Sequence, residues 1–174
     1  MLRPSRSGLE IEQGISPTTP LKVMAVPKRK YRELVFQLIY SYDLNDQLSL
    51  EKIYSLLDYL MVTKRTIREA FHHMMEVMRF LSTIDAVIGR ASSEYRIERI
   101  SCVEKNILRL GVFEILYDDE IPFKVVLSEA VRLARKFGTP ESSAFVHGVL
   151  DGVYHHCCRH ESEAEKDAVN ITKS

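Results

Sequence analysis

Hydrophobic residues recur along most of this chain at intervals of three and four residues, the spacing of amphipathic helices. No segment shows the two-residue alternation that is typical of a strand. The pattern therefore predicts an all-α fold with about seven helices in a single domain. The spacing and its stop signals place these helices at about 28–44, 49–60, 64–91, 103–117, 122–137 and from 139 onward, with one further turn between 92 and 101.

The segment 103–117 is apolar on nearly all sides, which is typical of a helix at the centre of a domain. Two charged residues, Arg109 and Glu114, interrupt it. An unpaired buried charge costs roughly 3–5 kcal/mol, so each of the two needs a partner or a path to the surface. We expect Arg109 and Glu114 to form a structural ion pair that fixes the register of the helix.

Composition changes at both ends of the helical pattern. Residues 1–26 contain Pro4, Pro17 and Pro20 with several Ser and Thr, and we interpret them as a disordered leader. Residues 27–156 are expected to form the folded domain, and residues 157–174 a flexible tail. Met24 lies just before the first helix and is an alternative start to Met1.

The charge and cysteine content exclude few functions. The 24 basic and 24 acidic residues balance, so composition alone gives no reason to expect nucleic acid. Three Cys, two of them adjacent, indicate a reducing cytoplasm rather than a disulfide framework. No apolar run is long enough for a membrane span. The cluster at 155–160 has metal-competent side chains, but its spacing matches no closed four-ligand site, so we expect no metal.

Candidate chemistry lies at the start of the first helix. Lys28, Arg29, Lys30 and Arg32 are basic, and Gln37 and Tyr40 follow on the same helix. Cations for phosphate, an amide for base edges and an aromatic ring for stacking are the mixture that binds single-stranded RNA. Four such cations predict a slope of about −3 when log affinity is plotted against log salt. The alternative is a solubilising helix start with Phe36 in the core.

Five segments together resemble the NusB family: KRKYRELVFQLIYSYD, IDAVIGRASSEYRIERI, ILRLGVFEIL, IPFKVVLSEAVRLARKFG and FVHGVLD. The resemblance implies an all-helical fold of two packed three-helix groups with a short extra helix. It also implies a non-enzymatic factor that needs no cofactor. Where the family has Asn in its last motif this chain has His147, Ala144 replaces a polar or basic residue, and Tyr95 stands where Trp is frequent.

The resemblance further implies a function in transcription antitermination. NusB proteins pair with NusE, a small-subunit ribosomal protein, and the pair binds boxA RNA. Together with other antitermination factors, the pair helps RNA polymerase to read through terminators in ribosomal RNA operons. The family's RNA site would include Lys28, Arg29, Lys30, Arg32, Gln37 and Tyr40, with Phe123 and Lys124 added from a later helix.

Two other functions stay open at this point. A NusB-like domain precedes the catalytic domain of some ribosomal RNA cytosine methyltransferases, so the chain would then be an accessory module. Alternatively it is a protein-interaction module without RNA binding, for example a homodimer when free. Neither alternative involves a membrane.

Overall fold

The chain forms a bundle of helices, described by a computed structural model for residues 26–45, 53, 62–92 and 97–171, without the side chains from 157 onward. This part contains no strand, which confirms the all-α prediction. The predicted leader, except Val26, and the predicted second helix, except the buried Ile53, lie outside the described residues. The described elements are α1 (Lys28–Leu44), α3 (Lys64–Arg79), α4 (Leu81–Ala91), the one-turn 3-10 helix η1 (Ile97–Arg99), α5 (Cys102–Tyr117), α6 (Phe123–Phe137) and α7 (Ser142–Ile171).

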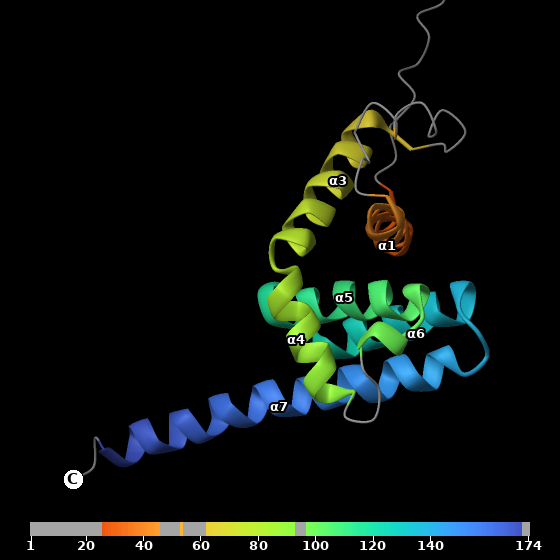
Figure 1. The fold of residues 1–174 in the computed structure, drawn as a ribbon. Coiled ribbons are helices and arrows are strands. Elements are labelled where there is room, and N and C mark those ends of the chain that lie inside the picture. Colours follow the sequence, from red (N-terminus) through yellow and green to blue (C-terminus); the bar gives the residue numbers. More distant parts are fainter. Residues whose placement is uncertain (1–25, 46–52, 54–61, 93–96, 172–174) are drawn as a thin grey trace, which may run out of the picture.

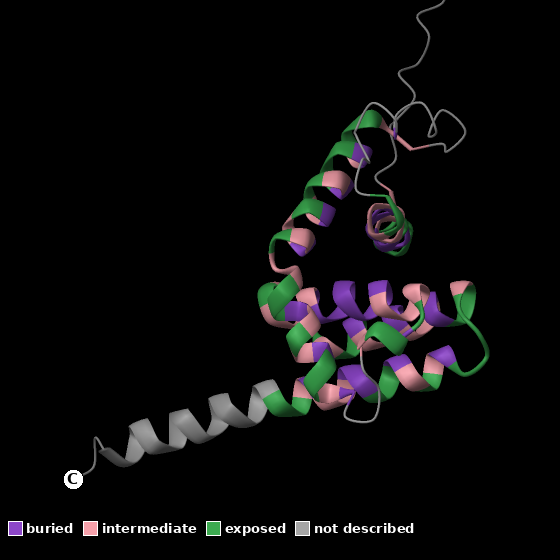
Figure 2. Cartoon of the chain, viewed as in Figure 1, coloured by how far each residue is buried: buried purple, intermediate pink, exposed green. Residues whose placement is uncertain are grey.

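Helix α5 is the centre of the bundle. Every residue from Asn106 to Val112 is buried, as is Glu114 (Figure 2), which agrees with the apolar pattern of the sequence. Helices α1 and α3 lie on one side of it, and α4, α6 and α7 contact it from the others (Figure 1). A side chain on Gly111 would place its Cβ only 3.0 Å from a methyl carbon of Leu150. Glycine therefore allows α7 to approach the central helix closely.

The prediction of one long helix over 64–91 was wrong, because the chain turns at Phe80 between α3 and α4. The buried residues keep a heptad-like spacing across the break: Ile67, Ala70, Met74, Val77, Ile84 and Ile88. No Pro or Gly marks the turn, so the periodicity contains no stop signal. The change of direction lets α3 pack on α1 while α4 packs on α5 and α7.

The predicted Arg109–Glu114 ion pair was also wrong. Arg109 pairs with Asp85 on α4 at 2.7 Å, and Glu114 pairs with Arg32 on α1 at 2.6 Å. Five residues along an α-helix turn the side-chain direction by about 140°, so the two charges face different neighbours. The underlying requirement holds, since each buried charge has a partner.

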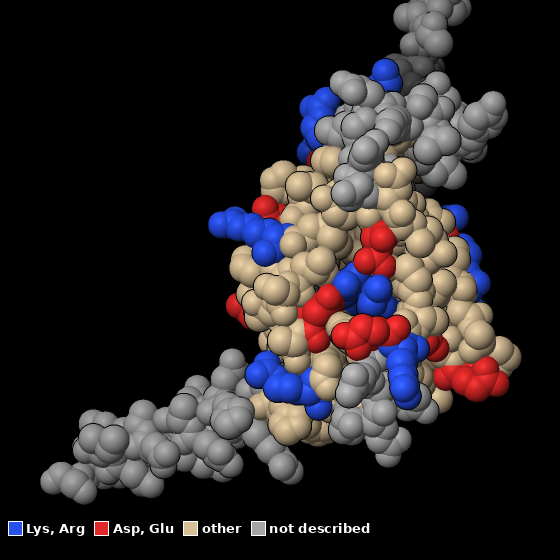
Figure 3. Space-filling model, in the orientation of Figure 1, with Lys and Arg blue, Asp and Glu red and all other residues tan. Residues whose placement is uncertain are grey.

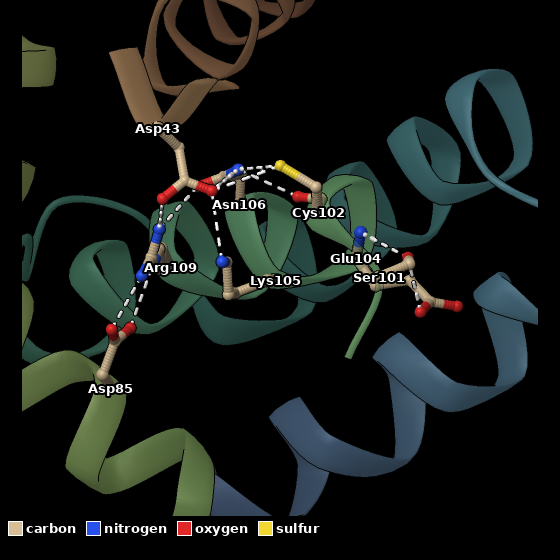
Figure 4. Close-up of polar contacts among 8 residues, drawn as sticks. All are labelled: Asp43, Asp85, Ser101, Cys102, Glu104, Lys105, Asn106 and Arg109. Atoms are coloured by element: carbon tan, nitrogen blue, oxygen red, sulfur yellow. Dashed lines mark hydrogen bonds and ion pairs between the residues drawn. The ribbon is translucent and has the colours of Figure 1, made fainter. Parts of the chain in front are cut away.

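Asp43 near the end of α1 joins Arg109 and Asp85 in one polar network (Figure 4). Its carboxylate accepts hydrogen bonds from Arg109 at 2.7 Å, Asn106 at 3.1 Å and the Cys102 thiol at 3.2 Å. Burial alone would raise the pKa of Asp43, but these donors outweigh it and hold the pKa well below its usual range. Acidic and basic side chains are accordingly intermixed at the middle of the face shown in Figure 3. The network ties α1, α4 and α5 together.

Helix α7 contributes to the core through its first three turns. Val146, Val149, Leu150 and Val153 are buried, and the helical backbone then continues to Ile171. The sequence predicted a flexible tail from residue 157. The structure gives that segment a helical backbone, and its flexibility stays a prediction.

Candidate functional site

The exposed basic residues at the start of α1 are the first part of the candidate site. Lys28, Arg29 and Lys30 are all exposed, and the first turn contains no acidic residue. Cations at a helix N-terminus oppose the helix dipole, so this arrangement costs a few tenths of a kcal/mol up to about 1 kcal/mol. A local cost without a local structural gain is typical of residues kept for another purpose.

A series of ion pairs between α1 and α6 partly neutralises this basic start. Arg29, whose side chain is 74% exposed, donates to Glu129 on α6 at 3.0 Å, and Glu129 also accepts from Arg132. Arg132 and Lys136 both pair with Glu33, one turn further along α1. Burial would raise the pKa of Glu33, but Lys136 and Arg132 lower it overall. We call these five residues the α1–α6 ladder.

Sequence reasoning missed the ladder although part of its signal was present. Arg29 and Glu33 are four residues apart on one helix, and Arg132 and Lys136 are four apart on the other, so each pair shares a face. A single-helix pattern does not say which face of α1 lies opposite which face of α6. The ladder shows the two helices to run parallel, with their long side chains bridging between them.

Arg32 does not belong to the exposed basic surface, which corrects its prediction as an RNA-binding residue. Its side chain is 8% exposed and its Nε donates to Glu114 at 2.6 Å. Burial raises the pKa of Glu114, and the charge of Arg32 acts in the opposite direction. Arg32 follows Lys28 by four residues on α1, but that side of the helix faces α5 at this point. The guanidinium is therefore a structural group in the interior.

Gln37 and Tyr40 lie two to three turns beyond the basic start. Gln37 is exposed and Tyr40 is half-buried. The Tyr40 ring lies 6.2 Å from Phe36, which itself packs 5.1 Å from Phe137 at the end of α6. Phe36 is in the core, as the alternative interpretation of this helix expected. At 1.5 Å per residue, Tyr40 is about 18 Å along the axis from Lys28.

Phe123 and Lys124 open α6, and a further aromatic residue joins them. The Phe123 ring stacks on Tyr154 of α7 with centroids 3.8 Å apart and planes 5° apart. Lys124 is exposed beside them. Sequence reasoning missed Tyr154, because it follows the last buried position of α7 and no motif marks it. One face of the Phe123 ring is therefore covered by Tyr154.

The described positions of the predicted RNA residues make two groups. Arg29 contacts Glu129 and Arg132 near the middle of α6, and Lys28 and Lys30 are its neighbours in the chain. Phe123 and Lys124 lie earlier on α6. Tyr40 lies near the opposite end of α6, about 20 Å from Phe123 at 1.5 Å per residue. Among the described residues, Lys28, Lys30 and Lys124 form no ion pair. Such a surface can neutralise phosphates and stack bases.

Comparison with known proteins identifies the family. The family model described as NusB family matches residues 29–155. The chain belongs to the NusB family. The match spans α1 through the buried turns of α7, so this NusB-family chain shares the whole described helical core with its relatives.

Curated relatives of this NusB-family chain are named as transcription antitermination protein NusB. The one from Thermodesulfovibrio yellowstonii is 32% identical over 149 residues, which cover 80% of this chain and 99% of that protein. The one from Pseudothermotoga lettingae is 36% identical over 128 residues, covering 72% and 89%.

Solved NusB structures share the fold. A structure of NusB from T. maritima has a TM-score of 0.65 at 30% identity and covers 76% of this chain and 93% of that one. A crystal structure of antitermination factors NusB and NusE in complex with double-stranded RNA has a TM-score of 0.64 at 25% identity, covering 74% and 96%.

Metal binding and membrane insertion find no support in the described part of this NusB-family chain. Within the described residues, no group of three or more His, Cys, Asp or Glu is placed to hold a metal ion. Of the predicted His/Cys cluster, His155 lies 3.6 Å from Asp151, and the side chains from Cys157 onward lie outside the described part. No helix in that part combines the length and apolar character needed to cross a bilayer.

Proposed function

We propose that this protein is an RNA-binding transcription antitermination factor of the cytoplasm that works as one half of a heterodimer. The observation that carries the proposal is the family match over the whole helical core, together with relatives that are named for this function over nearly their full length. The exposed cations that open α1 supply the electrostatic feature that such a function needs.

The proposed partners are a NusE protein and boxA-type RNA. A structural neighbour is a complex of NusB and NusE with double-stranded RNA, which supports both partners. For the RNA of this chain we favour an unpaired strand, because the stacked rings of Phe123 and Tyr154 offer a flat surface to a base that is free of its own stack. Double-stranded RNA would instead be recognised mainly through its backbone.

In this proposal the chain positions RNA and does no covalent chemistry. Lys28, Lys30 and Lys124 neutralise phosphates, while Phe123 and Tyr154 hold a base. The described cysteine, Cys102, is a poor nucleophile because burial and the neighbouring Asp43 raise the pKa of its thiol. The proposal therefore assigns no enzymatic activity to the protein.

Mixing the purified full chain with boxA-type RNA, with and without NusE, tests the proposal. We expect weak binding by the chain alone and at least tenfold tighter binding when NusE is present. A chain that binds NusE but leaves the affinity for RNA unchanged would instead be an interaction module. Failure to bind either partner would overturn the proposed function as a whole.

Two matched variants then test the assigned surface. Tyr154→Phe keeps the ring against Phe123 and should bind RNA as the original chain does, whereas Tyr154→Leu removes one ring of the stack. Base stacking on an aromatic side chain contributes about 1–3 kcal/mol, so Tyr154→Leu should weaken RNA binding by roughly five- to hundredfold. Equal affinities for the two variants would show that this stack is not part of the RNA site. The proposed antitermination function would then still be tested by NusE binding.

A further inference from the structure

An open groove lies between the start of α1, the middle of α3 and the end of α5, and the function proposed above makes no use of it. Its volume is about 390 Å³. Aromatic rings from two of the helices line it: Tyr31 from α1, with Phe113 and Tyr117 from α5. The rings of Phe113 and Tyr117 lie 5.4 Å apart, and Tyr117 is 42% exposed. The groove therefore offers flat aromatic surfaces to a ligand.

Three carboxylates surround the same groove and give it a negative potential. Glu69 pairs with the exposed Arg65, and Glu76 lies 3.9 Å from the exposed Arg79. Exposed pairs of this kind are weak, commonly below about 1 kcal/mol, so both acids stay available to another cation. Asp118 has no cation within ion-pair distance in the part of the chain that the structure describes. The local charge is thus acidic although the whole chain is neutral.

His73 lies between two of the aromatic side chains and adds a buried nitrogen without a hydrogen-bond partner among the described residues. Its ring centroid is 6.0 Å from that of Tyr31 and 5.5 Å from that of Phe113. Burial lowers the pKa of His73, so the ring stays neutral at neutral pH and does not offset the acidic charge. Its Nε2 is buried without a hydrogen-bond partner among the described residues, a state that costs about 1–3 kcal/mol. His73 lines the groove, so in the tautomer that leaves Nε2 unprotonated, a donor that reached this nitrogen would satisfy it.

We propose that this groove binds an arginine side chain presented by a partner protein. A guanidinium is planar, stacks on aromatic faces and donates five N–H groups, which match the carboxylates around the groove. A lysine ammonium lacks the flat surface and is more strongly hydrated. The groove is open along the surface, so it takes a side chain that projects from a folded partner or from an extended segment.

A nucleotide is the competing ligand, and the charges disfavour it. The three carboxylates would repel the phosphates of RNA. The exposed cations of α1, which attract phosphates, lie outside the groove, one to three residues before Tyr31. The molecule therefore places an acidic groove beside a basic surface. A partner that docks its arginine in the groove would lie at the edge of any RNA held by α1. The lining and the charge of the groove do not depend on whether α1 binds RNA.

Titration of the isotope-labelled full chain with a blocked Gly-Arg-Gly peptide, followed by NMR, tests this assignment. The matched ligands are the Gly-Lys-Gly peptide and uridine monophosphate. We expect the resonances of His73 and Tyr117 to move saturably with the arginine peptide in the millimolar range. The lysine peptide should bind at least threefold more weakly, and uridine monophosphate should leave these resonances unmoved.

Three variants complete the experiment. Asp118→Asn removes one charge at the exposed end of α5 and should weaken the arginine peptide at least fivefold. Tyr117→Leu should weaken it similarly, whereas Glu98→Gln, an exposed acid on η1, should not. Saturation by uridine monophosphate in place of arginine, equal binding of lysine, no saturation by any ligand, or full affinity in Asp118→Asn would each overturn the proposal.

Discussion

At the scale of single residues, burial decides whether a charge is structural or available. Arg32 and Lys30 are two residues apart on α1, yet the Arg32 side chain is buried and paired with Glu114 while Lys30 is exposed. Arg32→Met would leave the Glu114 carboxylate buried without a partner, so we expect the free energy of unfolding in urea to fall by about 3–5 kcal/mol. Lys30→Met should change it by less than about 0.5 kcal/mol.

A double variant, Arg32→Met with Glu114→Leu, tests further whether Arg32 is a structural or an RNA-binding residue. Replacing both charges by apolar groups removes the unpaired carboxylate, so most of the lost stability should return. If the single Arg32 variant instead kept its full stability but lost RNA affinity, Arg32 would be a binding residue as the sequence pattern first indicated.

Asp43 gives a residue-scale prediction about pH. Its pKa is lowered in the folded state, so it contributes stability above the unfolded pKa of about 3.9, and that contribution is lost as the pH falls toward the folded pKa. The Asp43→Asn variant should therefore be less stable than the original chain at pH 7, with a smaller difference at pH 3. Urea unfolding of both proteins at the two pH values measures this, and a difference that does not change with pH would contradict it.

At the scale of elements, the sequence predicted the existence of helices better than the way they face each other. The bounds of α1 match the prediction because Lys28 to Leu44 carries a clean apolar face that ends before the polar Asn45 and Asp46. The turn at Phe80 was missed because the apolar spacing continues through it. Partners across helices, such as Arg109 with Asp85, depend on packing that no single-helix pattern contains.

The α1–α6 ladder gives the element-scale prediction. Glu129, with a side chain 7% exposed, holds Arg29 and Arg132. Glu129→Gln would remove the ion-pair partner that Arg29 has among the described residues, while Arg132 would keep Glu33. We therefore expect tighter RNA binding together with a lower melting temperature. Fluorescence anisotropy and thermal unfolding measure the two effects. Glu98→Gln is the matched control on η1, away from the ladder, and should change neither. Weaker RNA binding by Glu129→Gln would mean that the ladder itself orients the RNA site.

At the scale of the whole molecule, a chain with no net charge has a basic surface where exposed cations lie together without acidic partners in the described part of the chain. Arg32 is buried and Arg29 is paired, whereas Lys28, Lys30 and Lys124 are exposed and form no ion pair within the described residues. Sequence reasoning found the basic segment because its cations are contiguous, but it counted Arg32, which burial removes from the surface. It missed Tyr154 because its contact with Phe123 joins two helices.

This change in the number of available cations alters the expected salt dependence of RNA binding. Each phosphate neutralised on a single strand contributes about −0.7 to the slope of log affinity against log salt, so three lysines predict a slope of about −2 rather than −3. Replacing Lys28 and Lys30 by Gln should bring the slope to about −0.7, because only Lys124 then remains. Lys64→Gln, an exposed cation on α3, should leave the slope unchanged. A slope that stays near −2 in the double variant would place the phosphate contacts on cations other than those that open α1.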